Sequence, residues 1–151
     1  SWIEKLPCPP IDLEIEGKVQ RTCLEGIENG VIISAHDCSD GGLVVAIAEM
    51  GFAIFNGPPL GANIFLPESL DVGECLFGEY PSRILVTIHE QRFSDLKRIA
   101  DSQDVKVTLL GEVAGDKLVI KQGNSILLER SINSLKKAWI NCLGSLFSDS
   151  V

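Results

Sequence analysis

Apolar residues recur at helical spacing in several stretches of the chain, and these stretches predict its helices. The first begins after Asp12, a residue type favoured at the N-cap, and ends before Gly30, which suits the left-handed position after a last turn. Two glycines at residues 41 and 42 open the second. The predicted helices are residues 13–29, 42–52, 74–77, 90–102 and 131–147.

Alternating or continuous apolar runs rich in β-branched residues predict the strands. The strongest signal is residues 83–88, and residues 31–35 have the pattern of a short buried strand. Short glycine-containing turns separate the last strands and predict hairpins. The predicted strands are residues 31–35, 62–66, 83–88, 106–113, 117–121 and 125–129. This order mixes crossovers with hairpins, so we expect an α+β domain with a mixed sheet and helices on at least one face.

Composition narrows the classes of function. At 151 residues, 45% of them hydrophobic, we expect one domain with a sizeable core. A net charge of −8 argues against a nucleic-acid surface, which needs clustered Lys and Arg. No apolar run is long enough to span a membrane, and no signal peptide is evident. The chain starts at Ser1 and ends in a polar tail, which suggests a domain cut from a larger protein.

The cysteines show no metal-ligand spacing. Their number is odd and their spacings are wide, which suits reduced thiols of a cytosolic protein. Cys23 and Cys142 lie in helical patterns and are interpreted as core residues. Cys38 is a conceivable nucleophile, but a thiol that faces the core is the favoured interpretation. The cysteines are Cys8, Cys23, Cys38, Cys75 and Cys142.

The candidate chemistry is concentrated in residues 34–43, Ser-Ala-His-Asp-Cys-Ser-Asp-Gly-Gly-Leu. A polar loop that leads into a glycine-rich helix start can bind an anion or a metal-phosphate group. Asp37 is a candidate Mg²⁺ ligand. Ser39 or Asp40 could instead cap the helix, and Gly41 with Gly42 could serve either phosphate binding or tight packing.

A second polar cluster at residues 76–83 precedes the strongest predicted strand. Glu79 and Tyr80 are candidate ligand contacts there, and Glu79 could instead pair with Arg83. The alternative is a solvated loop stiffened by its proline. His36 is interpreted as a hydrogen-bonded structural residue rather than a general base, and His89 as a surface residue.

These two segments carry a resemblance. The run Ser-Ala-His-Asp-Cys-Ser-Asp-Gly-Gly-Leu-Val-Val-Ala-Ile-Ala-Glu-Met at residues 34–50 closely resembles the C-terminal domain of the phosphoribosylformylglycinamidine synthase family. The run Leu-Phe-Gly-Glu-Tyr-Pro-Ser-Arg at residues 76–83 and the later Leu-Gly-Glu-Val at 110–113 also fit. The resemblance implies a three-layer α+β fold with a mixed sheet flanked by helices, like that of aminoimidazole ribonucleotide synthetase, with partial ferredoxin-like topology.

The resemblance also implies an activity. The family converts formylglycinamide ribonucleotide to formylglycinamidine ribonucleotide in purine biosynthesis, with ATP, Mg²⁺ and ammonia from glutamine. Residues 1–151 would be a single C-terminal domain of this cytoplasmic ligase, inactive alone. Its partners would be the upstream ATP-binding domains of the same polypeptide and the glutaminase and small accessory subunits.

Residue roles follow only at matching positions. Asp37 matches a metal-binding aspartate of the family, and Glu79 and Tyr80 match a loop that contacts substrate. From its position at the helix start, the run Ser39, Asp40, Gly41 and Gly42 is expected to face a substrate or nucleotide phosphate. The family's catalytic histidine lies in another domain, so no catalytic residue is assigned. Two alternatives remain: another superfamily member (a selenophosphate synthetase, thiamin-phosphate kinase or hydrogenase maturation protein), or a purely structural interaction domain.

Overall fold

The structure, a computed structural model, describes residues 10–52, 57–69 and 71–148, and of residues 142–148 only the backbone. The chain is divided into two compact units. The first consists of Ser1–Ala46 and Leu76–Thr108, and the second of Ile47–Cys75 and Leu109–Val151. Cys8 and the side chain of Cys142 lie outside the described residues. All the candidate site residues belong to the first unit.

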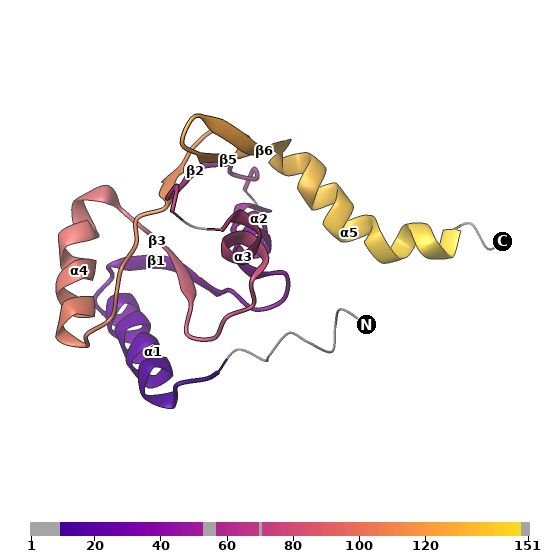
Figure 1. The fold of residues 1–151 in the computed structure, drawn as a ribbon. Coiled ribbons are helices and arrows are strands. Elements are labelled where there is room, and N and C mark those ends of the chain that lie inside the picture. The colour runs from indigo at the N-terminus through magenta and orange to yellow at the C-terminus, as the bar shows by residue number, and fades with distance from the viewer. Residues whose placement is uncertain (1–9, 53–56, 70, 149–151) are drawn as a thin grey trace. The chain divides into compact units, whose positions relative to one another are not determined.

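The first unit is built on an antiparallel pair of strands, β1 and β3 (Figure 1). His36 lies opposite Leu85 and Asp37 opposite Ile84 in this pair, which brings the loop after β1 beside the loop before β3. The elements of the unit are α1 (Leu13–Glu28), β1 (Ile32–Asp37), the start of α2 (Gly42–Phe52), the end of α3 (Val72–Phe77), β3 (Ile84–Ile88), the 3-10 helix η2 (Glu90–Arg92) and α4 (Phe93–Ser102).

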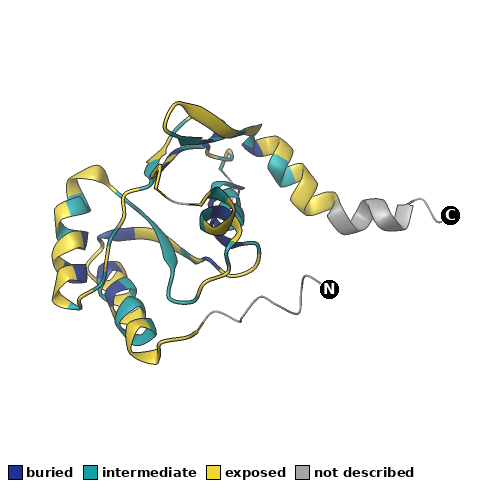
Figure 2. Ribbon diagram, in the orientation of Figure 1, coloured by how far each residue is buried: buried dark blue, intermediate teal, exposed yellow. Residues whose placement is uncertain are grey.

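Two helices and the start of β1 form the core of the first unit. Val31 and Ile32 pack with Leu96 and Ile99 of α4, and all four are buried. Cys23 of α1 packs against this cluster. Figure 2 shows the buried residues of α1 and α4 on one side of each helix and exposed residues on the other. This pattern is that of an amphipathic helix on a core.

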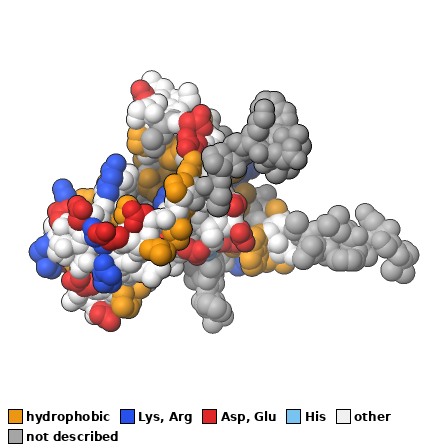
Figure 3. All heavy atoms as spheres, turned by 60° about the horizontal axis from the view of Figure 1, so that its bottom comes forward, with side chains coloured by type: hydrophobic (Ala, Val, Ile, Leu, Met, Phe, Trp, Pro, Cys, Tyr) orange, Lys and Arg blue, Asp and Glu red, His pale blue; other side chains and the backbone are white. Residues whose placement is uncertain are grey.

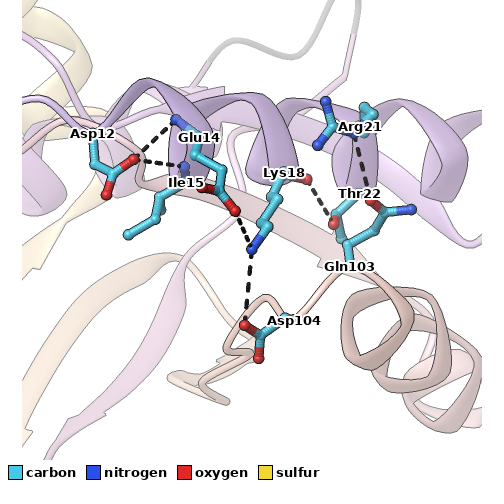
Figure 4. Close-up of polar contacts among 8 residues, drawn as sticks. All are labelled: Asp12, Glu14, Ile15, Lys18, Arg21, Thr22, Gln103 and Asp104. Carbon is cyan, nitrogen blue, oxygen red and sulfur yellow. Dashed lines mark hydrogen bonds and ion pairs between the residues drawn. The ribbon is translucent and has the colours of Figure 1, made fainter.

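The amino end of α1 is capped locally, as its sequence predicts. The Asp12 carboxylate accepts hydrogen bonds from the backbone N–H groups of Glu14, at 2.9 Å, and Ile15, at 3.1 Å (Figure 4). Farther along the helix, Lys18 Nζ lies 3.0 Å from Glu14 Oε1. The same nitrogen lies 3.9 Å from Oδ2 of Asp104, a residue that follows α4. These contacts are exposed, so they orient the chain more than they stabilise it.

Residues adjacent to the carboxyl end of α1 also account for where the helix stops. Gly30 has a φ of 62°, and its N–H donates to the carbonyl of Ile27 at 2.9 Å. The N–H of Val31 donates to the carbonyl of Gly26 at 2.8 Å. This pair of bonds is a Schellman motif, which satisfies carbonyls that the last helical turn leaves unpaired. The prediction that Gly30 ends this helix is confirmed.

The second unit contains a four-stranded mixed sheet in the order β4-β2-β5-β6. The pair β2 and β5 is parallel, and the other two pairs are antiparallel. Ile64, Leu118, Ile120 and Ile132 are buried in this unit. Its elements are the remainder of α2 and α3, β2 (Ala62–Leu66), β4 (Gly111–Val113), β5 (Lys117–Gln122), β6 (Ser125–Ser131) and α5 (Ile132–Ser148).

The carboxyl half of α2 and the helix α5 are in contact within the second unit. The rings of Phe52 and Trp139 lie 5.5 Å apart between their centroids. The indole N–H of Trp139 donates to the carboxylate of Glu49 at 2.9 Å. A polar partner for the indole N–H is usual where tryptophan packs on an apolar neighbour.

The predicted α+β class and mixed sheet are confirmed, but the strands divide between two sheets. Two predictions about single strands are wrong. Residues 106–110 are not a strand: β4 begins only at Gly111, which pairs with Ile64, and β2 ends two residues later at Leu66. The strand β1 extends two residues beyond its predicted end and is mostly exposed rather than buried; among the described residues, β3 alone pairs with it.

Charged side chains of both signs share one region of the surface. On the face that Figure 3 shows, Lys and Arg side chains are interspersed with Asp and Glu over the part of the molecule that holds α1 and α4. Among the helices of the described ranges, none combines the length and the apolar character needed to cross a membrane.

Candidate functional site

Two loops of the first unit hold the candidate site. The loop of residues 38–41 connects β1 to α2, and the 78–83 loop connects α3 to β3; both can be followed in Figure 1. The backbone N–H of Cys38 donates to the carbonyl of Arg83 at 3.1 Å, which extends the β1–β3 pairing into the loops. The antiparallel pairing therefore brings together residues that are far apart in the sequence, such as Asp37 and Ile84.

Asp37 ends β1 with an ionised and accessible carboxylate. Its Oδ2 accepts a hydrogen bond from Ser39 Oγ at 2.6 Å, and its side chain is 70% exposed. The Ser39 hydroxyl, with a smaller contribution from the His36 ring, lowers the pKa of Asp37 below its usual range. The carboxylate is therefore charged at neutral pH and can bind a cation.

The amino end of α2 is capped by a residue far away in the sequence. The N–H of Gly41 donates to Glu79 Oε1 at 2.8 Å, and both partners are accessible to solvent. Gly42 donates its N–H to the Ser39 carbonyl at 3.0 Å. A carboxylate therefore already lies where a ligand anion would approach the helix dipole. The site is open to water, so an anion of higher charge could compete for it.

Gly42 has a packing role that its sequence only partly reveals. It is buried, with a φ of 70°, and a Cβ at this position would lie 2.8 Å from the carbonyl oxygen of Leu76 and from the backbone of Phe77. Gly41, with a φ of 77°, faces the side chain of Val45. Close packing, one of the two interpretations left open above, is therefore seen at Gly42.

The remaining candidates differ in their contacts. Asp40 is exposed, and its carboxylate has no hydrogen-bond partner within the described part of the chain, so it does not cap α2. Tyr80 is 38% exposed, and the Arg83 guanidinium lies 5.3 Å from its ring centroid. Arg83 does not pair with Glu79: its Nη2 donates to the carbonyl of Gly78. This role of Arg83 within the loop is absent from the sequence-based prediction.

The histidines and the buried cysteine agree with their structural interpretations. Nδ1 of His36 lies 2.7 Å from the backbone oxygen of Asp37, and His89 is exposed. Cys38 is 4% exposed, and burial raises the pKa of its thiol. A thiol in this environment stays protonated at neutral pH, so Cys38 is not an activated nucleophile.

The described residues contain no group of three or more His, Cys, Asp or Glu side chains that could hold a metal ion. The end of β1 and the two loops nevertheless contain the carboxylates of Asp37, Asp40 and Glu79, against the single guanidinium of Arg83. Mg²⁺ commonly takes only one or two protein carboxylates and completes its shell with phosphate oxygens and water. One ionised carboxylate therefore fits Mg²⁺ only together with a phosphate.

Comparison with known proteins identifies the family. The family described as AIR synthase related protein, C-terminal domain, matches residues 3–122, which is most of the chain. The chain belongs to this family. Together with the two relatives described next, this match confirms the resemblance that residues 34–50 and 76–83 carry.

Two relatives with the same name are similar to most of this chain. The phosphoribosylformylglycinamidine synthase subunit PurL of Thermomicrobium roseum is 34% identical over 131 residues, 87% of this chain and 17% of the relative. The PurL subunit of Synechococcus sp. is 42% identical over 135 residues, 86% of this chain and 17% of the relative. The chain thus spans about 17% of the length of these relatives.

The fold has counterparts among solved structures. The structure of PurLQS from Thermotoga maritima matches 85% of this chain and 23% of that chain, with a TM-score of 0.75 and 24% sequence identity. This likeness establishes the fold of the AIR synthase related domain and agrees with the elements described above.

Proposed function

We propose that residues 1–151 form one domain, the C-terminal domain of an ATP-dependent ligase that converts formylglycinamide ribonucleotide to formylglycinamidine ribonucleotide in the cytoplasm. The observation that carries this proposal is the similarity of most of the chain to PurL subunits. Related structures are described as T. maritima PurL complexed with FGAR and with ATP. These names favour this function over a selenophosphate synthetase, a thiamin-phosphate kinase or an interaction domain.

The chain would act as one wall of a nucleotide or substrate cleft. The upstream ATP-binding domains of the same polypeptide would supply the catalytic residues, so the chain alone would be inactive. The name PurLQS of the T. maritima structure is consistent with further subunits, and we propose a glutaminase and a small accessory protein. ATP would be the phosphoryl donor of the parent enzyme, with Mg²⁺ to neutralise its phosphates.

Within the site, Asp37 would bind Mg²⁺, and Ser39, Asp40, Gly41, Gly42, Glu79 and Tyr80 would face a phosphate-bearing ligand. The charge of the two loops supports a metal-bound phosphate over a free one. A bare phosphate would meet several carboxylates and would have to replace Glu79 at the Gly41 amide. A phosphate that carries Mg²⁺ would instead be attracted through the metal to Asp37, whose pKa is lowered.

A chimeric enzyme tests this function. The segment of the Synechococcus PurL subunit that matches this chain is replaced by the chain, and the chimera is expressed in a purine auxotroph. We expect growth without added purine. A chimera that accumulates as soluble protein to the level of the unaltered subunit but does not support growth would contradict the proposed function.

The same chimera tests the metal site. We expect Asp37→Ala to slow growth and to raise the Mg²⁺ concentration that the purified enzyme needs for half-maximal activity. Asp101→Ala is the matched control, because Asp101 is an exposed aspartate of α4 outside both loops. Equal growth and equal Mg²⁺ dependence of the two variants would refute the role of Asp37 and leave the family assignment intact.

A further inference from the structure

The 78–83 loop contacts the amino-terminal regions of two helices. Glu79 accepts the N–H of Gly41 at the start of α2, at 2.8 Å. Ser82 Oγ donates to Glu16 Oε2 in the first turns of α1, at 2.7 Å. The conformation of these few residues therefore decides where the Glu79 carboxylate lies relative to α2.

One side chain organises the 78–83 loop from within. Arg83 Nη2 donates to the carbonyl of Gly78, so the last residue of the loop is bonded to the first. The guanidinium also lies 5.3 Å from the centroid of the Tyr80 ring, within the range of a cation–π contact. The backbone carbonyl of Arg83 accepts the N–H of Cys38, which anchors the same residue to the neighbouring loop.

The loop does not have a relaxed conformation of its own. Ser82 has a φ of 61°, a left-handed value that a residue with a side chain rarely adopts. The Nε of Arg83 is buried and has no hydrogen-bond partner within the described residues. Such features persist only where the surroundings hold them in place, and the other contacts of the Arg83 guanidinium supply that constraint.

We propose that Arg83 is a positioning residue, which folds the 78–83 loop so that Glu79 caps α2 at Gly41 and Tyr80 is held beside it. The biological meaning of the inference rests on the proposed function, in which Glu79 and Tyr80 face the ligand.

The amide of Gly41 provides a direct measurement. An amide proton that donates to a carboxylate resonates downfield, so the ¹H–¹⁵N spectrum of the chain at neutral pH reports this contact. The Glu79→Ala variant shows where the Gly41 signal lies when the amide has lost its carboxylate acceptor. We expect Arg83→Gln to move the signal at least about half of the way to that position, because a charged acceptor makes the stronger bond. The signals of Val31 and Ile99 should stay in place.

Arg98→Gln is the matched control, because Arg98 is an exposed arginine of the same unit and lies 4.0 Å from Asp95. It should leave Gly41 at the wild-type position. A wild-type Gly41 signal in folded Arg83→Gln would overturn the proposal. Movement of Val31 and Ile99 together with Gly41 would also overturn it, because it would indicate a merely structural role.

If Arg83→Gln does not fold, the same measurement on Arg83→Lys tests the proposal. Lysine keeps the charge but lacks the planar guanidinium that contacts both Gly78 and Tyr80. A partial shift of the Gly41 signal supports the proposal, and no shift overturns it. Because the measurement contains no ligand, its failure is distinct from failure of the chimera to support growth.

Discussion

The amino ends of α1 and α2 are capped differently, one by an adjacent residue and the other by a residue distant in the sequence. Both helices begin with N–H groups that have no partner within the helix. At α1, Asp12 accepts two of these groups from a position next to the helix in the sequence. At α2, the acceptor is Glu79, which lies 38 residues away from Gly41. A local cap is part of the helix itself, whereas a remote cap exists only when another segment is folded correctly.

The two helix ends also differ in whether a ligand could replace the capping group. The cap of α1 is formed by an adjacent residue, so it does not depend on another segment of the chain. The cap of α2 depends on an exposed carboxylate that a ligand could replace, and it lies beside the ionised carboxylate of Asp37. Where a chain uses remote groups for a task that local ones can perform, the remote arrangement is a candidate for function.

The largest expected effect is at Gly42. Gly42→Ala places a Cβ 2.8 Å from the carbonyl oxygen of Leu76 and the backbone of Phe77, at a φ of 70°. We expect a loss of about 3 kcal/mol in the free energy of unfolding, from steric overlap added to left-handed strain. Urea denaturation measures it.

Gly30→Ala is the control for this prediction. Gly30 has a φ of 62°, but a Cβ there would meet nothing within 4 Å. Only the backbone strain remains, so the expected loss is about 1 kcal/mol. Equal losses for the two variants would show that the contact between the start of α2 and the end of α3 is not tight.

The next effect tests the local cap. Asp12→Ala removes the acceptor of two backbone N–H groups of α1, and we expect a loss of about 1 kcal/mol in the free energy of unfolding. Asp12→Asn should recover most of this loss, since an asparagine oxygen accepts the same bonds. If Asp12→Asn is as destabilised as Asp12→Ala, the charge near the helix dipole matters more than the hydrogen bonds.

The contrast between the two caps explains how far the sequence predicts this structure. Asp12 and Gly30 were predictable because their partners lie within a few residues, and the turn at Gly123, with a φ of 56°, follows from the same local chemistry. The separation of β1 and β3 into their own sheet was not predictable, because strand pairing depends on distant segments. The same holds for the missing strand at residues 106–110.

In the candidate site, too, residue types were predictable from the sequence but contacts between distant segments were not. The residues of its two loops were named from their types and from family resemblance. That Glu79 would accept the Gly41 amide depends on the three-dimensional course of both loops. That Arg83 would contact Gly78 and not Glu79 depends on the folded conformation of the 78–83 loop. No spacing in the sequence encodes contacts that join two loops through the pairing of β1 with β3.

A smaller effect is expected for the remote cap. Glu79→Ala removes the acceptor of the Gly41 amide, and we expect a loss of about 0.5 kcal/mol, because the exposed amide regains a bond to water. Asp40→Ala is the control, an exposed carboxylate of the same site without a hydrogen-bond partner in the described chain, and it should leave the urea midpoint unchanged. A loss for Glu79→Ala as large as that for Asp12→Ala would remove the distinction between the two caps.

The smallest effect is a change in pH dependence where the 78–83 loop contacts α1. The hydrogen bond from Ser82, followed by that from Gln20, lowers the pKa of Glu16 below its ordinary value of 4.5. Because the pKa is lower in the folded state, the unfolded chain binds more protons between the two values. The contribution of Glu16 to stability is therefore present above pH 4.5 and is lost as the pH falls through the lower, folded value.

Ser82→Gly removes the main cause of this shift without left-handed strain, since glycine accepts the φ of 61°. We expect the free energy of unfolding to decline less steeply below pH 4.5 than in the wild type. Glu16→Gln should flatten the same range, and the double variant should be no flatter than Glu16→Gln alone, because both changes act on one titrating group. Additive flattening would mean that Ser82 acts on another carboxylate, and the 78–83 loop would then be linked to α2 but not electrostatically to α1.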